Sequence, residues 1–243
     1  MIAILTFCVG GDYKRAMEPG LESKRQYAKK HGYALHIGGE DVWDRTRPIP
    51  WSKIRFLLKY LDEYDYIFMS DADVIIMNQE ITLETLITRL PPNKDILWTL
   101  DACEHYNNGN MLIRGKTPWV NDFFQRVYLQ TELIHHIWWD NAGMIQVYNK
   151  NPDDAKHIET VKEHWLFNAY VFDKHNSAVS SARLYKPGDF LIHFAGVYDI
   201  WNIYRMMNYM RQGNHDPIVL DDWRKHPPNG KTGADTSFIE IIQ

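Results

Sequence analysis

The chain has 243 residues and a mass of 28.7 kDa, which is enough for one substantial domain with a full hydrophobic core. Hydrophobic residues make up 45%, charged residues 24%, and the net charge is −4, a balance that is ordinary for a globular protein and excludes the basic surface of a nucleic-acid-binding protein. No run of about 18 apolar residues predicts a membrane span, and two cysteines are too few for a disulfide framework.

The first part of the chain predicts alternating strands and helices. The apolar and β-branched runs predict strands, and the helical spacing of apolar residues predicts helices: strands at Ile2–Phe7, Tyr33–Ile37 and Asp65–Met69, helices at Glu18–His31 and Trp51–Tyr60. Gly32 stands where a left-handed helix cap is expected. This order with short connections predicts a parallel sheet flanked by helices, whose ligands bind beyond the carboxyl ends of the strands.

The second part is less regular, and a loop-rich tail follows it. The same criteria predict three further strands and three further helices: strands at Ile96–Thr99, Asn110–Ile113 and Phe190–Phe194, helices at Pro118–Thr131, Asn141–Tyr148 and Trp201–Met210. Prolines and glycines become frequent after Gln212, where the chain carries Pro217, Pro227, Pro228, Gly230 and Gly233. We therefore expect one domain over residues 1–212 and a loop-rich tail over 213–243.

Two carboxylates follow the buried third strand of the prediction. Asp71 and Asp73 come directly after the run that ends at Met69. Side chains one residue apart on an extended chain point to opposite faces, so both carboxylates can converge only if the backbone turns there. Such a pair suits a hard divalent cation, which can in turn hold a diphosphate. The alternative is an ordinary turn, because aspartate is frequent in turns.

Seven segments in order resemble the galactosyl/mannosyltransferase family of retaining glycosyltransferases, which includes plant xyloglucan xylosyltransferases and yeast Golgi α-mannosyl- and α-galactosyltransferases. The matching segments run from residue 1 to about 210 and are Lys24–Tyr33, Trp51–Lys53, Tyr66–Asp73, Asn107–Arg114, Asp140–Asn141, Phe167–Tyr170 and Gly188–Gly196. The resemblance implies an α/β fold of the GT-A (Rossmann-like) type, with a mainly parallel central sheet flanked by helices and a nucleotide-sugar site.

The resemblance also implies a metal site. It makes Asp73 a metal ligand, lets Asp71 share the metal or reach the ribose, and makes His193 the third ligand. A lone histidine before Phe-Ala-Gly would more often be a core residue, and the matched segment around it reverses that expectation. A nitrogen added to an oxygen set suits Mn²⁺ better than Mg²⁺.

The remaining site residues are expected to hold the donor. The resemblance assigns nucleotide or donor binding to positions at strand ends and in the matched segments: Thr6, Phe7, Cys8, Lys53, Asp71, Ala72, Asn108, Gly109, Asn110 and Gly196. It assigns a catalytic role to Asp140 and Asn141, with Asp140 near the anomeric carbon of the sugar. Asp140 also suits a helix N-cap, and the Asn-Gly pair at 108–109 also suits a plain turn.

The sequence departs from the family pattern at two places. Asn141 stands where relatives carry a glutamine, so its amide reaches less far by one methylene. The lysine expected after Gly196 is absent, and Arg205 or Lys53 would have to contact the diphosphate in its place. Five aromatic residues could stack on an acceptor sugar, although each alone is more often a core residue: Trp138, Trp139, Trp165, Tyr198 and Trp201.

The function expected from this pattern is Mn²⁺-dependent transfer of a sugar, with retention, from a UDP- or GDP-linked donor to a glycan hydroxyl. One alternative is a glycogenin-like retaining transferase, and another is a non-catalytic protein of the same fold that binds nucleotide sugars. We expect a cytoplasmic or soluble protein from the chain as given, or a Golgi luminal one if it is a trimmed eukaryotic form. Nucleic acid is not an expected partner, and no membrane span is expected in this chain.

Overall fold

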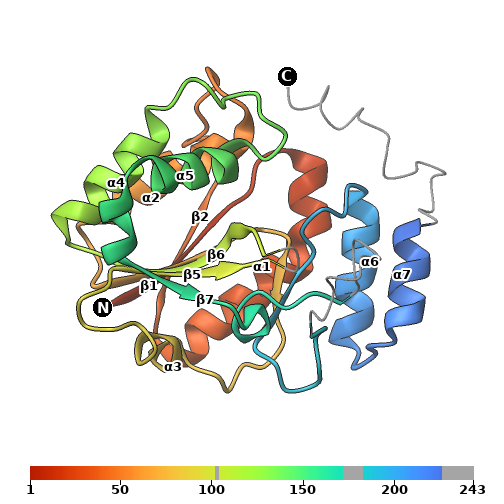
Figure 1. Ribbon diagram of the computed structural model, residues 1–243. Coiled ribbons are helices and arrows are strands. Elements are labelled where there is room, and N and C mark those ends of the chain that lie inside the picture. The colour runs from red at the N-terminus through yellow and green to blue at the C-terminus, as the bar shows by residue number, and fades with distance from the viewer. Residues whose placement is uncertain (102–103, 172–182, 226–243) are drawn as a thin grey trace.

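A six-stranded sheet forms the centre of the computed structural model, which describes residues 1–101, 104–171 and 183–225 (Figure 1). Its strand order is β2-β1-β3-β6-β5-β7. The strands are β1 (Ile2–Phe7), β2 (Ala34–Gly38), β3 (Tyr66–Ser70), β5 (Ile96–Leu100), β6 (Tyr106–Arg114) and β7 (Ile158–Val161).

The sheet is mostly parallel, as predicted. β1 pairs in parallel with both β2 and β3, and β5 pairs in parallel with β7. β6 runs antiparallel to its two neighbours, β3 and β5. Because β1, β2 and β3 run in one direction, their carboxyl ends meet at one edge of the sheet, where Gly10 and Asp71 leave β1 and β3.

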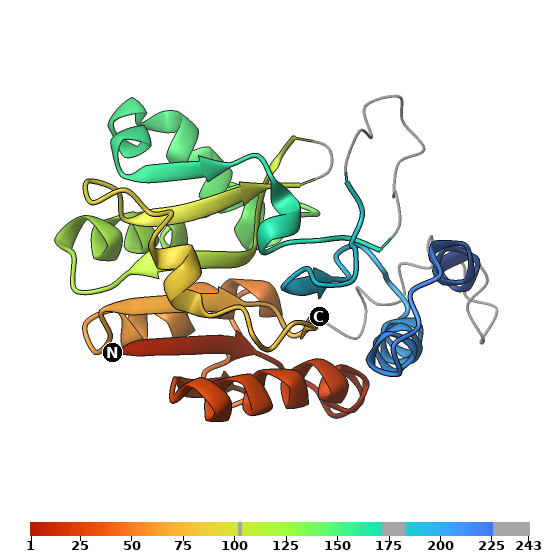
Figure 2. The ribbon, with the colours of Figure 1, turned by 90° about the horizontal axis from the view of Figure 1, so that it is seen from below.

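Helices cover both faces of this sheet. Those in the described residues are α1 (Gly11–His31), α2 (Ser52–Tyr60), α3 (Leu83–Ile87), α4 (Pro118–Tyr128), α5 (Trp139–Lys150), α6 (Ile200–Arg211) and α7 (Pro217–Lys225), with 3₁₀ turns at Ile49–Trp51, Pro152–Lys156 and His164–Leu166. Figures 1 and 2 show α2, α4 and α5 on one face and α1 and α3 on the other, with α6 and α7 beside α1.

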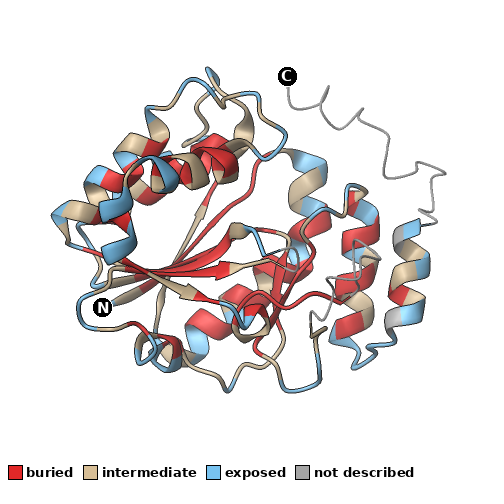
Figure 3. Cartoon of the chain, viewed as in Figure 1, coloured by how far each residue is buried: buried red, intermediate tan, exposed pale blue. Residues whose placement is uncertain are grey.

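Alternating side chains divide the core between these two layers. On β1, Ala3 and Leu5 pack into the cluster beneath α2, α4 and α5, whereas Ile4 packs on the opposite side with α1. On β3, Ile67 joins the first cluster and Phe68 the second. Alternate side chains of each strand are therefore buried on opposite faces of the sheet. Figure 3 shows the buried residues concentrated along the strands.

A second, two-stranded sheet lies on the α1 side and brings distant parts of the chain to the strand ends. It consists of β4 (Val74–Ile76) and β8 (Leu191–His193), which pair antiparallel with Val74 opposite His193. Three residues separate the end of β3 at Ser70 from the start of β4 at Val74. The short pairing therefore fixes the acidic segment between β3 and β4 beside the histidine of β8.

Several elements differ from the sequence prediction: β4, β7, α3 and α7 were not predicted, and β6 begins at Tyr106 rather than at Asn110. α1 begins at Gly11 and not at Glu18, and it continues through Pro19. Part of the predicted loop-rich tail is helical, because α7 spans Pro217–Lys225 and buries Leu220 against α6, while residues 226–243 lie outside the described part. Among the described residues, no helix combines the length and the apolar character needed to cross a bilayer.

Candidate metal and donor site

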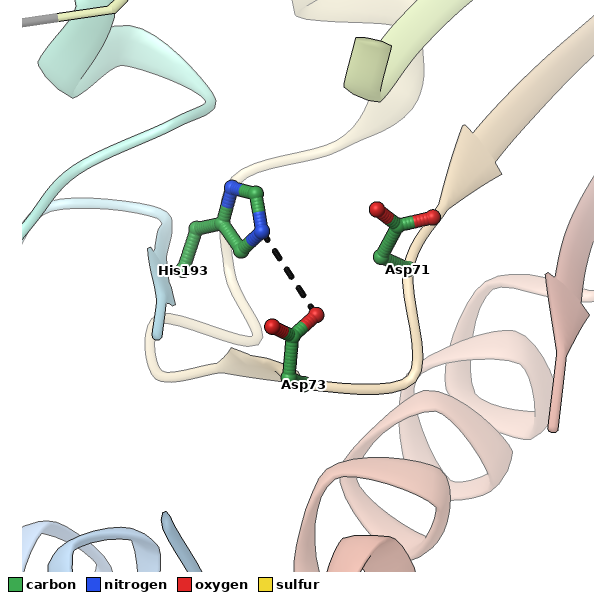
Figure 4. Close-up of side chains that lie close together, drawn as sticks. All are labelled: Asp71, Asp73 and His193. Atoms are coloured by element: carbon green, nitrogen blue, oxygen red, sulfur yellow. Dashed lines mark ion pairs between the residues drawn. The ribbon is translucent and has the colours of Figure 1, made fainter. Parts of the chain in front are cut away.

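The two aspartates lie on either side of a turn between β3 and β4. The backbone N–H of Asp71 donates to the carbonyl of Gly109 on β6 at 2.7 Å, and the turn closes with a bond from the N–H of Val74 to the carbonyl of Asp71 at 3.3 Å. The carbonyl of Asp73 accepts from the N–H of Phe194 at 3.0 Å. The backbone thus turns where the sequence required it, and both carboxylates face the same space (Figure 4).

His193 completes a group of three side chains that could hold a metal ion. One ligand atom each from Asp71, Asp73 and His193 lies within 4.8 Å of the other two. Nε2 of His193 faces Oδ1 of Asp73 at 3.5 Å (Figure 4). The imidazole is 4% exposed and belongs to β8, so a strand pairing holds it in place.

Burial and charge act in opposite directions on the two carboxyl groups. Burial raises the pKa of Asp71, although Lys53 opposes this effect. Burial would also raise the pKa of Asp73, but the charge and hydrogen bonding of His193 outweigh it, and the pKa is lowered. A cation bound between the two groups would favour the ionised form of both.

Lys53 connects the metal group to the predicted catalytic carboxylate. Its ammonium group donates to Oδ1 of Asp71 at 2.9 Å and lies 3.2 Å from Oδ2 of Asp140. Burial alone would lower the pKa of Lys53, but Asp140 and Asp71 outweigh it, and the pKa is raised. Since Lys53 is only 6% exposed, this charge belongs to the interior of the site and not to the surface.

An irregularity in β6 brings residues 108–110 to the site, and Asn108 contacts Asp140 and Lys53 there. Trp98 of β5 pairs with Met111 and the next residue, Thr99, pairs with Asn107, so residues 108–110 have no opposite residue on β5. Such a bulge re-aims the strand. Nδ2 of Asn108 donates to Asp140 at 2.7 Å, and Oδ1 of Asn108 accepts from Lys53 at 3.1 Å.

Gly109 lies under the imidazole of His193. A methyl group at Gly109 would be 2.2 Å from Cε1 of His193 and 2.8 Å from its Nδ1. The sequence suggested that this glycine allows close approach of a donor sugar. The structure gives a different reason for it, because the neighbour that needs the space is the histidine ring.

Asn141 and Asn110 face the protein rather than open space. The amide of Asn141 accepts from the N–H of Asn108 at 3.0 Å and donates to the carbonyl of Tyr106 at 3.1 Å, so α5 is fastened to β6. Asn110 is fully buried and donates to Oδ1 of Asn168 at 3.1 Å. These contacts suit residues that hold the site in shape.

The expected residues at the end of β1 and near the turns are mostly buried. Thr6 is fully buried, Cys8 is 1% exposed and Phe7 is 9% exposed. The side chain of Ala72 packs into the cluster between α1 and α6, whereas Gly196 is exposed in a left-handed turn with φ of 69°. Burial raises the pKa of Cys8 to about 12, so its thiol stays protonated at neutral pH.

Of the two cations considered for the missing lysine, only Lys53 lies at the acidic pair in the described structure. Arg205 belongs to α6, donates to Asn202 at 2.8 Å and stacks its guanidinium over Trp223 at 4.3 Å from the ring centre. Those contacts hold it against α7.

Lys24 and Tyr13 are two residues near the site that sequence reasoning did not assign to it. Lys24 is fully buried and its ammonium group donates to the carbonyl of Val74 at 2.6 Å. Burial lowers its pKa to about 8 although Asp73 and Asp71 oppose the shift. The pKa of Tyr13 on α1 is raised by burial and then by the charge of Asp73. The sequence signal for Lys24 was its position on the apolar face of a predicted helix, where a lysine is unusual.

The geometry fits a divalent cation. Two carboxylates and one imidazole nitrogen point into one space, which gives a mixed oxygen and nitrogen ligand set. Three protein ligands leave coordination positions for a substrate. The ammonium group of Lys53 lies between Asp71 and Asp140, in contact with both carboxylates.

Comparison with protein families confirms the resemblance predicted from the sequence. The model of the galactosyl transferase GMA12/MNN10 family matches residues 3–97, a segment that includes Lys53, Asp71 and Asp73. No curated protein matches the sequence at a significant level.

Solved structures share the fold and little sequence. A glycosyltransferase involved in glycosylation of the major capsid of PBCV-1 superposes with a TM-score of 0.65 at 13% identity, covering 85% of this chain and 98% of its own. GlyE of Streptococcus pneumoniae gives 0.61 at 13% identity, covering 91% and 62%. The galactosyltransferase LgtC, bound to donor and acceptor sugar analogues, gives 0.52 at 12% identity, covering 91% and 99%. The fold is therefore that of GT-A glycosyltransferases.

Proposed function

We propose that this protein is a retaining glycosyltransferase that moves a sugar from a nucleoside diphosphate sugar to a hydroxyl group of a glycan, with Mn²⁺ in the donor site. The observation that carries the proposal is the convergence of Asp71, Asp73 and His193 beyond the carboxyl end of β3. The GT-A fold and the family match support sugar transfer independently of these three residues.

Asp71, Asp73 and His193 would hold the metal in this reaction. A bound divalent cation would act as a Lewis acid that stabilises the nucleoside diphosphate as it leaves. Lys53 would add a second positive charge on the diphosphate side, in place of the lysine that is missing after Gly196. Its charge is secured by two carboxylates, so it would stay protonated throughout turnover.

Asp140 would act on the sugar. It lies at the first turn of α5, where the positive end of the helix dipole favours a carboxylate, and it is fixed by Asn108 and Lys53. A fixed negative charge there can accept hydrogen bonds from donor hydroxyls and stabilise positive charge that develops at the anomeric carbon. We assign Asn141 to holding α5 on β6, because both groups of its amide are bonded to backbone.

The proposed course is attack on the face from which the diphosphate leaves. The acceptor oxygen forms a bond to the anomeric carbon while the bond from that carbon to the phosphate oxygen breaks. The proton of the acceptor hydroxyl passes to a phosphate oxygen, so the configuration is retained without a protein nucleophile. The contribution of the protein is position and charge.

An aromatic side chain next to Asp140 suits the acceptor. Trp138 precedes α5, is 45% exposed and has its ring 5.4 Å from that of His105. Trp139, which lies between Trp138 and Asp140 in the sequence, has a backbone φ of 41°. A positive φ is uncommon for a bulky residue and occurs at functional sites. Stacking of a sugar ring on the exposed indole would bring an acceptor hydroxyl toward the donor.

A binding and transfer experiment tests the proposal. UDP- and GDP-sugars are screened by thermal shift with and without Mn²⁺, on wild type, Asp73→Asn and the exposed control Asp62→Asn. We expect a metal-dependent shift with one nucleotide, present in the control and lost in Asp73→Asn. Transfer to a glycan with retention, followed by NMR of the anomeric proton, completes the test. No metal-dependent shift with any nucleotide would refute the proposal, and binding without transfer would favour the non-catalytic alternative.

A further inference from the structure

The histidine of the metal group is held on the side opposite Asp73 by a buried amide. Nδ1 of His193 donates to Oδ1 of Asn168 at 2.7 Å. Asn168 is fully buried, just after the 3₁₀ turn at His164–Leu166 and before the strand β8. An amide oxygen only accepts hydrogen bonds, so this contact requires the hydrogen on Nδ1.

Two further contacts fix the orientation of that amide. Nδ2 of Asn110 donates to the same Oδ1 of Asn168 at 3.1 Å, and Nδ2 of Asn168 donates to the hydroxyl of Tyr170 at 2.7 Å. The oxygen of Asn168 therefore faces His193 and Asn110 together. Buried amide groups are costly where they stay unbonded, and Oδ1 of Asn110 has no hydrogen-bond partner among the described residues, so this network has a cost that an apolar core would avoid.

The backbone beneath the ring is also adapted to it. Gly109 leaves the space that Cε1 and Nδ1 of His193 occupy, and its carbonyl accepts from the N–H of Asp71 at 2.7 Å. The ring of Tyr170 is nearly parallel to that of His193, with centres 6.1 Å apart. The imidazole is thus held at its edge by Asn168 and at its face by Gly109.

From this geometry we infer that Asn168 is a positioning residue for the metal site: it keeps the hydrogen of His193 on Nδ1 and so presents the lone pair of Nε2 to the space shared with Asp71 and Asp73. The inference rests on the proposed function, because it takes that space as the metal site. An outer hydrogen-bond partner of a metal-binding histidine fixes the tautomer and orientation of the ring, and losing it costs roughly 10- to 100-fold in metal affinity.

Three variants separate positioning from stability. Asn168→Leu keeps the approximate volume and removes the acceptor, whereas Asn168→Asp keeps an acceptor oxygen toward Nδ1. Asn202→Leu is the matched control, because Asn202 is also a buried asparagine, 1% exposed, and donates to the carbonyl of Trp223 at 2.7 Å between α6 and α7. Urea unfolding measures the stability of all three.

Mn²⁺ binding to the metal-free protein is measured by titration followed by electron paramagnetic resonance. We expect the dissociation constant to rise about 10- to 100-fold in Asn168→Leu and to stay within about threefold of wild type in Asn168→Asp and Asn202→Leu. An unchanged dissociation constant in a folded Asn168→Leu would overturn the inference.

A second measurement needs no variant at position 168. ¹⁵N NMR of the metal-free wild type identifies which ring nitrogen carries the hydrogen, with His193 assigned by comparison with His193→Gln. We expect the hydrogen on Nδ1. A hydrogen on Nε2 would show that the amide of Asn168 faces the other way and would refute the inference even if Asn168→Leu did not fold. Wild type that binds no Mn²⁺ would count against the proposed function, and the NMR result would still decide the tautomer.

Discussion

Replacing Lys53 by methionine tests the charge balance of the site. The substitution keeps the length of the side chain and removes an ammonium group that lies 2.9 Å from Asp71 and 3.2 Å from Asp140. Removing one partner of a buried ion pair costs about 3–5 kcal/mol. The side chain of Asp71 is 28% exposed and can be hydrated, and Asp140 keeps its bond from Asn108, so we expect the low end, about 3 kcal/mol.

The assay is urea unfolding of the metal-free protein, with Lys59→Met on the exposed side of the same helix as the control. The control should change the free energy of unfolding by less than about 0.5 kcal/mol. Saturating Mn²⁺ should narrow the difference between Lys53→Met and wild type, because a cation then neutralises Asp71 again. A loss below about 1 kcal/mol, or one that Mn²⁺ leaves unchanged, would refute the reasoning.

Three further substitutions have expected outcomes. Gly109→Ala should push the ring of His193 aside and weaken Mn²⁺ binding about tenfold or more by calorimetry, because the added methyl would lie 2.2 Å from Cε1. Trp138→Ala should raise the KM for the acceptor about tenfold in transfer kinetics and leave donor affinity unchanged. Asp44→Asn should lower stability at pH 7 by about 1–2 kcal/mol, because hydrogen bonds from Thr46 and Tyr128 lower the pKa of Asp44 to about 2. Since the folded pKa lies below the unfolded one, the difference from wild type should shrink as pH falls from about 4 toward 2.

Matched controls accompany these three. Gly11→Ala adds a methyl whose nearest neighbour is 3.9 Å away, so Mn²⁺ affinity should not change. Trp201→Ala removes another partly exposed indole, 36% exposed on α6, and should leave the acceptor KM unchanged. Asp62→Asn alters an exposed carboxylate and should give no pH-dependent difference. Equal effects in a variant and its control would contradict the corresponding argument.

The first three strands and the helices between them could be predicted because their signals are local. β1, β2 and β3 lie within one or two residues of the predicted limits, and Gly32 caps α1 in the left-handed conformation. The predicted start of α1 at Glu18 was wrong, because the helix begins at Gly11 and runs on through Pro19 and Gly20. The helix continues there because Gly20 packs against backbone: a methyl at that position would be 2.6 Å from the carbonyl oxygen of Val74.

Contacts between distant segments could not be predicted from local patterns. β4 and β8 are three residues each, and their pairing places Val74 opposite His193 across more than a hundred residues of sequence. Residues 108–110 have no opposite residue on β5 because the register between β5 and β6 shifts there, and no property of these three residues alone specifies that shift. α7 was missed because Pro217 read as a loop signal, although proline is well tolerated in the first turn of a helix.

Some residues of the candidate site were expected from the sequence, and others became apparent only in the structure. Asp71, Asp73 and His193 were expected from the resemblance, and the structure brings them together. The role of Asn168 was not expected, because a fully buried asparagine in a matched segment gives no sign of which side chain it contacts. Lys24 was noticed only as part of a matching helix. Partners of this kind are set by packing in three dimensions.

The balance of charge around the acidic turn explains why metal and donor would bind together. The carboxylates of Asp71, Asp73 and Asp140 face the ammonium groups of Lys53 and Lys24, which leaves one negative charge when His193 is neutral. A divalent cation alone would make the net charge of the buried site positive. A diphosphate alone would make it more negative. Only the two together return the site close to its starting charge, so each should favour binding of the other.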